Sequence, residues 1–479
     1  MGSLLKRLLA SSIAYQAPSI VSAALALLTL PLYTRALTQA EYGYAETLLT
    51  FIILSSILLR VGIGEAFVRF WFDDEDAERR ERLARTTVTV VAATTSVAAL
   101  AGLALAGPLS ELLLDTRDAG LLACGLLGLW AFTNLEVAYA LLRVEERRRA
   151  YVRAGLANVL LTVTLTVVLV VVLDQGARGY VLGNYAASTV VLFALWADQG
   201  ARIRPVVPRR LGPLLRFGAP TVPAEAAVFA LNVIDRAYLV RAESPAAAGV
   251  YAVGVKLATV VILVVRGFQA AWPPLAYSVE DDEEAGRLYA TVTTLYVLIV
   301  GAAVAALTLL SRWIVDLLVA PKWGEAHEVL PWVALGWALY GLYLVFVTIA
   351  GRAKVTTRNA PAALAGLVVN VVVLVVAVDR VGIAGAGIAL CAAYAVMLVA
   401  IHLLTRRLFV VPFAWGRMAA IAMVLAAIAV GGELLLPTEG ATGLLARCAA
   451  IALIPFALLA LSTAAERDVV RRVARRERF

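Results

Sequence analysis

Charged residues interrupt several long apolar stretches of this 479-residue chain. They are Arg60, Glu136, Glu225, Asp235, Arg236, Lys256 and Arg266. An arginine or lysine at the centre of a bilayer costs about 2.5–3.5 kcal/mol even on the lenient insertion scale. We therefore expect these side chains to line an aqueous cavity or to pair between helices. Because arginine stays protonated and its planar fork matches phosphate oxygens, this pattern predicts binding of a phosphate-bearing substrate.

The elements that must position these residues are transmembrane helices. The chain is 62% hydrophobic and 16% charged, with a mean hydropathy of +0.86, whereas soluble domains carry about 25% charged residues. Blocks of about 20 apolar residues match a helix that crosses the hydrocarbon core. The sequence predicts an all-α, polytopic membrane bundle of about fourteen such helices, beginning near residues 12, 45, 87, 119, 154, 179, 217, 249, 288, 329, 360, 382, 418 and 443.

Basic residues gather in alternate connections, which sets the predicted orientation. On this topology about 30 Lys and Arg lie on one side and about 7 on the other, and the positive-inside rule makes the richer side cytoplasmic. Both termini are then cytoplasmic. Because these charges are spread over regularly spaced loops, the net charge of +8 does not indicate a nucleic-acid partner.

Two parts of the sequence resemble each other at a constant spacing. The segments RALTQAEYG (35–43) and RAESPAAAG (241–249) are 206 residues apart, and the same offset relates Arg60 to Arg266. The acidic runs 73–76 and 281–284 follow closely. We expect two pseudo-symmetric six-helix lobes, 1–210 and 211–410, then two further helices in 411–465 and a basic tail, 466–479. Transporters built this way bind substrate between the lobes and expose it alternately to each side.

Within this scheme Arg60 and Arg266 are the leading cavity candidates, because they occupy equivalent positions. Asp235, Arg236 and Lys256 form a second tier towards the outer side, and Glu225 and Arg35 complete the candidate set. Two structural alternatives stay open. Asp235 and Lys256 could form an ion pair that fixes the seventh helix against the eighth, and Arg60 and Arg266 could extend to the membrane interface.

No arrangement of residues indicates catalysis or a metal site. His327 and His402 are isolated, no zinc-protease or nucleophile motif occurs, and Cys124, Cys391 and Cys448 lie in apolar blocks. We expect no catalytic residue, no metal and no cofactor, and the protein is not predicted to be an enzyme. A membrane-bound glycan polymerase or transferase would need acidic catalytic groups or a sizeable outer loop.

Three segments carry a family resemblance: LPLYTRALTQAEYGYAETL (30–48), RVGIGEAFVRFW (60–71) and LNVIDRAYLVRAESPAAAGVYAVGVKLA (231–258). With the Asn232, Asp235, Tyr251 pattern, they resemble bacterial polysaccharide-unit flippases of the multidrug/oligosaccharidyl-lipid/polysaccharide exporter superfamily. The resemblance implies a multi-pass protein of the bacterial inner membrane that turns a polyprenyl-diphosphate-linked oligosaccharide over to the outer leaflet for surface polysaccharide synthesis. The cationic cavity would hold the diphosphate and sugars while the lipid tail stays among the membrane lipids.

Two other transport functions remain open. Sister groups of that superfamily flip the peptidoglycan lipid precursor, which carries the same diphosphate chemistry. An ion-coupled exporter of small molecules would use acidic residues to bind its coupling H⁺ or Na⁺, and Asp235 and Glu225 are the candidates.

Overall fold

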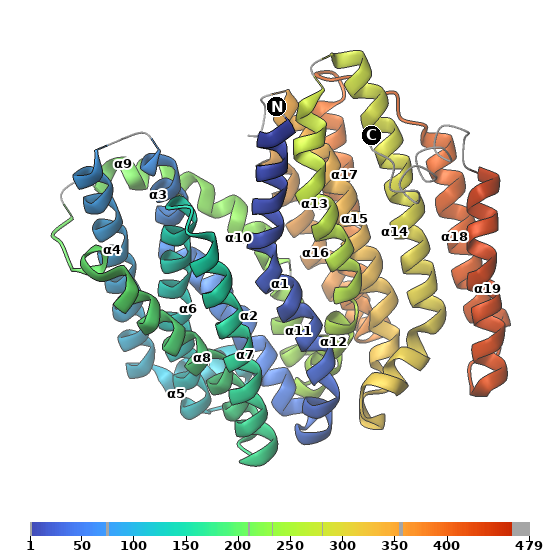
Figure 1. Cartoon of the computed structure of the whole chain (residues 1–479). Helices are drawn as coiled ribbons and strands as arrows, with labels where there is room; N and C mark the ends of the chain where they lie inside the picture. Colours follow the sequence, from blue (N-terminus) through green and yellow to red (C-terminus); the bar gives the residue numbers. More distant parts are fainter. Residues whose placement is uncertain are drawn as a thin grey trace. The chain divides into compact units, whose positions relative to one another are not determined.

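The computed structural model describes residues 2–72, 76–208, 211–231, 233–279, 281–353 and 358–461. Backbone alone is described for residues 2–16, 201–202, 224, 228, 270–271, 274 and 458–461. All regular structure in these ranges is helical (Figure 1), so the all-α prediction is confirmed. The chain separates into two compact units, Met1–Ala252 and Val253–Phe479. The predicted lobe boundaries stay a prediction, and the tail 466–479 lies outside the described residues.

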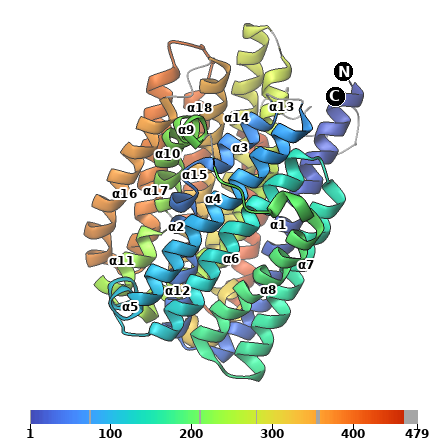
Figure 2. The same ribbon diagram turned by 90° about the vertical axis from the view of Figure 1, so that its left-hand side faces the viewer.

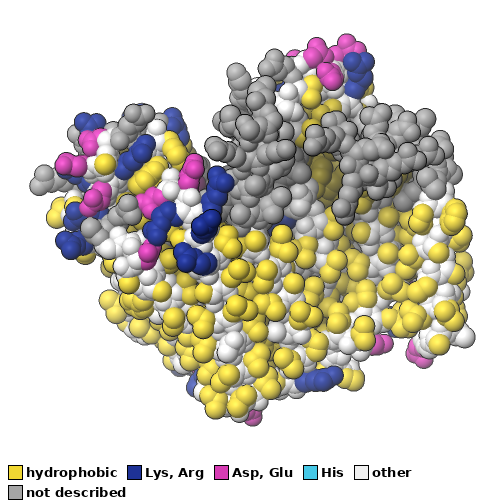
Figure 3. Space-filling model, in the orientation of Figure 1, with side chains coloured by type: hydrophobic (Ala, Val, Ile, Leu, Met, Phe, Trp, Pro, Cys, Tyr) yellow, Lys and Arg dark blue, Asp and Glu magenta, His cyan; other side chains and the backbone are white. Residues whose placement is uncertain are grey.

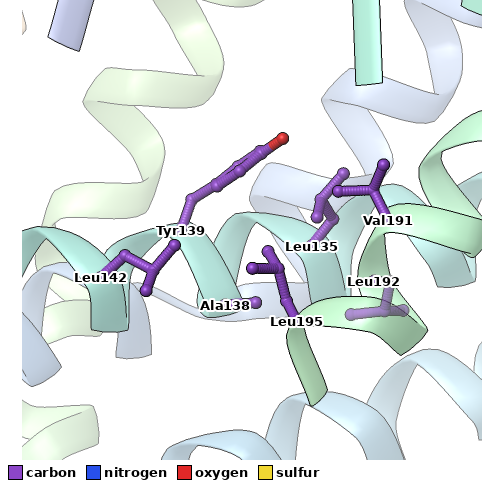
Figure 4. Packing of buried hydrophobic residues seen from close by; sticks show 7 residues of the cluster. All are labelled: Leu135, Ala138, Tyr139, Leu142, Val191, Leu192 and Leu195. Carbon is purple, nitrogen blue, oxygen red and sulfur yellow. The ribbon is translucent and has the colours of Figure 1, made fainter. Parts of the chain in front are cut away.

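The first unit is a bundle around α6. Helix α6 packs against α8, α4 and α2, while α7 packs against α8 and α1 (Figures 1 and 2). Leu135, Ala138, Tyr139 and Leu142 of α6 meet Val191, Leu192 and Leu195 of α8 in a buried cluster (Figure 4). The helices are α1 (Gly2–Ala36), α2 (Gln39–Arg60), α3 (Ile63–Trp71), α4 (Ala77–Ala104), α5 (Ala106–Leu114), α6 (Ala119–Val144), α7 (Arg148–Val167), α8 (Gly176–Gln199), α9 (Leu211–Gly218), α10 (Val222–Ala230) and α11 (Ile234–Ala242), with short turns η1 (Val168–Val172), η2 (Gly200–Ile203) and η3 (Ala219–Thr221).

The second unit is built on two sets of helix contacts. Helix α17 packs against α15 and α16, and α14 packs against α15, α18 and α19. Ala305 of α14, Ile421 and Leu425 of α18, and Ile454 of α19 share one buried cluster. The helices are α13 (Thr259–Ser278), α14 (Asp282–Leu318), η4 (Pro321–Trp323), α15 (Ala326–Arg352), α16 (Asn359–Val381), α17 (Ala384–Thr405), α18 (Trp415–Leu435) and α19 (Gly440–Leu461); α12 (Pro245–Leu257) crosses the unit boundary.

The exposed flanks of the helices are apolar in both units. Val97 and Leu100 of α4 are each 67% exposed, and Leu435 of α18 is 84% exposed. Hydrophobic side chains cover the visible flanks of the helices, and charged side chains gather near helix ends (Figure 3). Such surfaces are favourable only against lipid. In the described residues, twelve helices are long and apolar enough to cross a membrane, or thirteen when α12 and the start of α13 count as one bent span. The predicted multi-pass bundle is confirmed.

The predicted seventh span is broken instead of continuous. Segment 211–242 forms α9, η3, α10 and α11 in succession, none longer than nine residues. Pro220 and Pro223 lie at the first break, where each removes a backbone donor. The first helix keeps its continuous course despite Pro18 and Pro31. The eighth span bends by 46° between Leu257 and Thr259.

The helix caps repeat at the predicted offset. Thr38 caps α2 by accepting the backbone N–H of Glu41 at 3.2 Å, and Ser244 caps α12 by accepting that of Ala247 at 3.0 Å. These residues are 206 apart (244 minus 38). The acidic runs act alike, because Asp76 caps α4 and Asp281 caps α14. Asp73, Asp74 and Glu75 lie outside the described residues.

Candidate functional site

The cytoplasmic end of α2, on the predicted topology, presents Arg60. The turn after it uses Val61 and Gly62 with positive φ values of 48° and 69°. A Cβ atom on Gly62 would lie 2.0 Å from the carbonyl oxygen of Gly218, so glycine alone allows this close approach to α9. The approach brings α10 beside α2, and Arg60 Nη2 lies 3.6 Å from Glu225 Oε1. The structure therefore brings these two predicted site residues together.

A cavity of about 310 Å³ opens beside Arg60 within the first unit. Its charged lining comprises Arg60, Glu65, Glu136 and Arg143, and Thr87 adds a hydroxyl. Glu136 was predicted from the sequence as a charge inside the membrane. Arg143 falls among the basic residues of a predicted connection, and its hydropathy context gives no sign that it lines the same cavity. The site thus offers two guanidinium groups for an anion and two carboxylates that accept hydrogen bonds from hydroxyl groups.

Asp235 and Arg236 form the second predicted tier, on α11, and point to different partners. Asp235 is 1% exposed and accepts a hydrogen bond from the Tyr251 hydroxyl at 2.8 Å. Arg236 donates from Nη1 to the hydroxyl of Thr50 on α2, and this hydroxyl donates to the backbone oxygen of Glu46 at 2.6 Å. Asn232 lies outside the described residues.

The remaining candidates do not join the Arg60 cavity. Arg35 is exposed in the last turn of α1. Lys256 on α12 is half-buried and Arg266 on α13 is exposed, and both belong to the second unit. The predicted roles of these three residues stay predictions.

Sequence reasoning missed a buried acid on α2, Glu46. Its side chain is 7% exposed, and Glu46 Oε1 accepts a hydrogen bond from the Tyr180 hydroxyl at 2.8 Å. The predicted second span begins near residue 45, so Glu46 fell at its margin and was not counted as a membrane charge. The signal that could have found it is the spacing Glu46, Thr50, which places both residues on one face of the helix.

The opposite end of α2 approaches the backbone of α12 closely at two glycines. A Cβ atom on Gly43 would lie 1.9 Å from the oxygen of Pro245, and one on Gly249 would lie 2.1 Å from the oxygen of Gln39. The contact is reciprocal, because Gln39 and Pro245, like Gly43 and Gly249, are 206 residues apart. The two helix starts thus cross about a local two-fold axis, with no room for a side chain at either glycine.

A second buried charge that the sequence reading missed lies in the second unit. Arg447 of α19 is 0% exposed and pairs with Glu433 of α18. It also donates to the oxygens of Leu309 and Pro437 and lies 5.0 Å from the ring centroid of Trp313. These contacts tie together α14, α18 and α19.

The sequence comparison decides the family. The model of a family described as "Polysaccharide biosynthesis protein" matches residues 32–328. This chain belongs to that family. The match contains every predicted cavity residue from Arg35 to Arg266, and it ends before Glu433 and Arg447. None of the curated proteins matches the sequence significantly.

Solved structures of membrane transporters have a fold similar to that of this polysaccharide biosynthesis protein. The lipid II flippase MurJ in an inward closed conformation is similar with a TM-score of 0.76 and 13% identity, over 96% of this chain and all of that one. An inward-facing multidrug resistance MATE family transporter of the MOP superfamily reaches 0.68 at 15% identity, over 85% and 98% of the two chains. A MOP superfamily transporter from Pyrococcus furiosus, described as having a binding pocket of reverse polarity, reaches 0.60 at 15% identity, over 88% and 96%. The protein has the fold of these membrane transporters, and the family predicted from sequence is confirmed.

Proposed function

We propose that this member of the polysaccharide biosynthesis family flips polyprenyl-diphosphate-linked oligosaccharide units from the cytoplasmic to the outer leaflet by alternating access. The observation that carries the proposal is the cavity beside α2, where Arg60 and Arg143 lie with Glu65 and Glu136. In this one cavity, arginine side chains that can bind phosphate lie beside carboxylates that can bind sugar hydroxyls. On this proposal the protein is a transporter of the bacterial inner membrane with both termini in the cytoplasm.

The charges of the cavity assign different parts of the substrate to different residues. The two arginines donate to diphosphate oxygens, whereas Glu65 and Glu136 accept hydrogen bonds from sugar hydroxyls. Two positive and two negative charges balance, so a diphosphate needs further cations. Arg266 and Lys256 are our candidates for these, since they stand in the same family match.

The hydrocarbon tail of such a substrate stays among the membrane lipids. The exposed flanks of α4 and α18 are apolar, so the protein meets lipid along these helices. Only the polar headgroup then has to cross, and a charged cavity removes the cost of placing that headgroup in hydrocarbon.

A second candidate is an ion-coupled exporter of small molecules. The observation that favours it is the acidic share of the same cavity, where Glu65 and Glu136 could hold a cationic substrate. A cationic drug would be repelled by Arg60 and Arg143, so this function would require the two arginines to be dispensable.

Complementation of a bacterial strain that lacks its polysaccharide-unit flippase tests the proposal. Wild-type protein should restore surface polysaccharide, and Arg60→Ala combined with Arg266→Ala should lower it at least about tenfold, because each charge-assisted hydrogen bond contributes about 1.5–3 kcal/mol. Arg117→Ala is the matched control, since that arginine side chain is 74% exposed at the α5–α6 loop.

The outcomes separate the alternatives. Rescue by the double variant would remove the arginines from the substrate site. Rescue of a strain depleted of its lipid II flippase, without rescue of the polysaccharide strain, would assign the peptidoglycan precursor instead. Export of a cationic drug driven by an ion gradient in proteoliposomes, unchanged in the double variant, would establish the exporter.

A further inference from the structure

Glu46 is a carboxyl group buried in the first unit that the proposed substrate site does not use. It lies more than three helical turns from Arg60 on the same helix, α2. Its side chain is 7% exposed and is held by the Tyr180 hydroxyl of α8. The ring of Tyr180 packs edge-on against Tyr33 of α1 at 5.2 Å and against Tyr42 of α2 at 5.5 Å. The tyrosine that holds this carboxyl group is therefore itself packed against two further tyrosines.

Hydroxyl groups, more than charges, surround Glu46. Among the described residues, three cations lie on the helices that pack against this part of α2. Arg178 on α8 pairs with Asp118 at 2.8 Å, Arg241 on α11 donates to the backbone oxygen of Leu112, and Arg236 on α11 donates to Thr50. Tyr33, Tyr42, Tyr180 and Tyr185 lie around Glu46, and Asp235 is bonded to Tyr251. Glu111 of α5 pairs with Arg117 on the surface. At the Arg60 end of α2 the packed helices carry Glu136, Tyr139 and Arg143 of α6, Glu225 of α10, and Arg79, Arg80, Arg82 and Arg85 in the first turns of α4; Tyr238 is on α11.

Arg236 is hydrogen-bonded to the residue one helical turn after Glu46. It donates to Thr50, which is four residues after Glu46 and so lies on the same face of α2, about 5–6 Å away between Cβ atoms. The Nε atom of Arg236 is buried and has no hydrogen-bond partner among the described residues. Its guanidinium group thus has donor capacity that Thr50 does not fill.

An ionised carboxylate in hydrocarbon surroundings is costly unless a proton or a cation neutralises it. Both neutralising partners are within reach of Glu46: a proton, and the guanidinium group of Arg236. One carboxylate cannot be fully neutralised by both at once.

We propose that Glu46 is a proton-binding site in which a proton and the Arg236 guanidinium group compete for one carboxylate. In the protonated form the O–H bond neutralises Glu46, and Arg236 stays on Thr50 as the structure shows it. When the O–H bond breaks and the proton passes to water, Arg236 moves one helical turn to the carboxylate. Because Arg236 belongs to α11, proton release changes how α11 sits on α2. Only the link to transport rests on the proposed function.

Infrared difference spectroscopy of the full chain in lipid nanodiscs tests the proton site without any substrate. Titration between about pH 5 and about pH 9, a range that covers carboxyl groups in apolar sites, should show the loss of one protonated carboxyl band. The band should be absent in Glu46→Gln, which keeps a hydrogen-bonding partner for Tyr180. It should persist in Glu111→Gln, the matched control, since Glu111 pairs with Arg117 on the surface. A titration unchanged in Glu46→Gln would overturn the proposal.

A second measurement tests the competition between the proton and Arg236. Arg236→Gln removes the competing cation, so the midpoint of the Glu46 band should move to higher pH by about one unit or more. Arg236→Lys keeps the charge and should restore most of the wild-type midpoint. Equal midpoints in wild type, Arg236→Gln and Arg236→Lys would show that Arg236 does not affect proton binding by Glu46. The proposed competition between the proton and the guanidinium group would then be wrong.

Transport supplies the last readout and keeps the two proposals separable. We expect Glu46→Gln to lose rescue of the polysaccharide-deficient strain, and Glu111→Gln to retain it. A normal infrared titration with no rescue by the wild-type protein would sink the flippase proposal and leave the proton site standing. Full rescue by Glu46→Gln would show that proton exchange there does not drive transport.

Discussion

Two arginine–glutamate pairs inside the helical bundle have opposite surroundings. Arg447 is 0% exposed, donates to both oxygens of Glu433, reaches two backbone oxygens and lies over the Trp313 ring. Arg60 is 16% exposed, faces Glu225 at 3.6 Å, donates to the oxygen of Ser56 at a long 3.4 Å and borders a cavity. Each nitrogen of the first guanidinium group donates to a protein oxygen. The second keeps donors available for a ligand.

This difference separates a structural arginine from a binding arginine. A buried charge is tolerated when protein groups satisfy all its donors, and removing one partner then leaves the other uncompensated. An arginine that holds a substrate must keep part of its fork open, so its protein contacts are fewer and longer. Hydropathy alone cannot distinguish the two, because both interrupt apolar stretches.

The largest effect should come from Arg447→Ala. It leaves Glu433 without its partner and takes one donor from each of two backbone oxygens, so we expect a loss of about 3 kcal/mol in the free energy of unfolding. A thermal denaturation series in detergent measures it as a lowered Tm. Arg447→Ala with Glu433→Ala should recover part of the loss, because no uncompensated charge remains. An Arg447→Ala protein as stable as wild type would show that the Arg447–Glu433 pair is not structural.

A smaller effect on stability, and a larger one on function, should follow from exchanging the charges at the open pair. Arg60→Glu combined with Glu225→Arg keeps opposite charges 3.6 Å apart, and since the two side chains are 16% and 40% exposed, stability should change by less than about 1 kcal/mol. Surface polysaccharide should nevertheless be lost, because the cavity has lost its arginine. Parallel melting and complementation assays check both. If the exchanged pair restored polysaccharide, Arg60 would be structural like Arg447.

The smallest effect should come from the Asp118–Arg178 pair, whose side chains are 28% and 59% exposed and which serves as a reference for the other two pairs. Asp118 accepts hydrogen bonds from Arg178 and from the backbone N–H of Leu121, each at 2.8 Å. Partial burial raises the pKa of Asp118, but these hydrogen bonds and the Arg178 charge outweigh it, so the pKa is lowered. A lowered pKa in the folded state contributes stability above the unfolded value of about 3.9, and this contribution disappears as pH falls through the folded pKa.

Asp118→Asn removes that contribution. The Tm difference between wild type and variant should reflect less than about 1 kcal/mol from pH 7 to about pH 5, shrink below about pH 4, and narrow at high salt. A Tm difference that grew as the pH fell would contradict the lowered pKa of Asp118. A Tm difference as large as that of Arg447→Ala would show that side-chain exposure does not determine how much each of the three pairs stabilises the protein.

Several features could be predicted from the sequence because they depend on local composition or on spacing. The repeat offset of 206 between Gly43 and Gly249 predicted equivalent positions, and the caps Thr38 and Ser244 repeat at the same spacing. The charge of Arg60 within an apolar stretch predicted a polar partner. That partner could not be identified, because Glu225 is 165 residues away (225 minus 60), and the break at Pro220 and Pro223 decides where it lies.

By itself the sequence determined that the chain is an all-α, multi-pass membrane protein with charged groups inside its bundle, since each apolar stretch must form its own backbone hydrogen bonds in lipid. Only the tertiary structure decided which of those charges are satisfied. Arg143 joins the cavity, Glu46 is buried against Tyr180, and Arg447 is paired with Glu433. The physical reason is that hydropathy sums over a segment, whereas the role of a charge depends on the one direction in which its side chain leaves the helix and on which other helix meets it there.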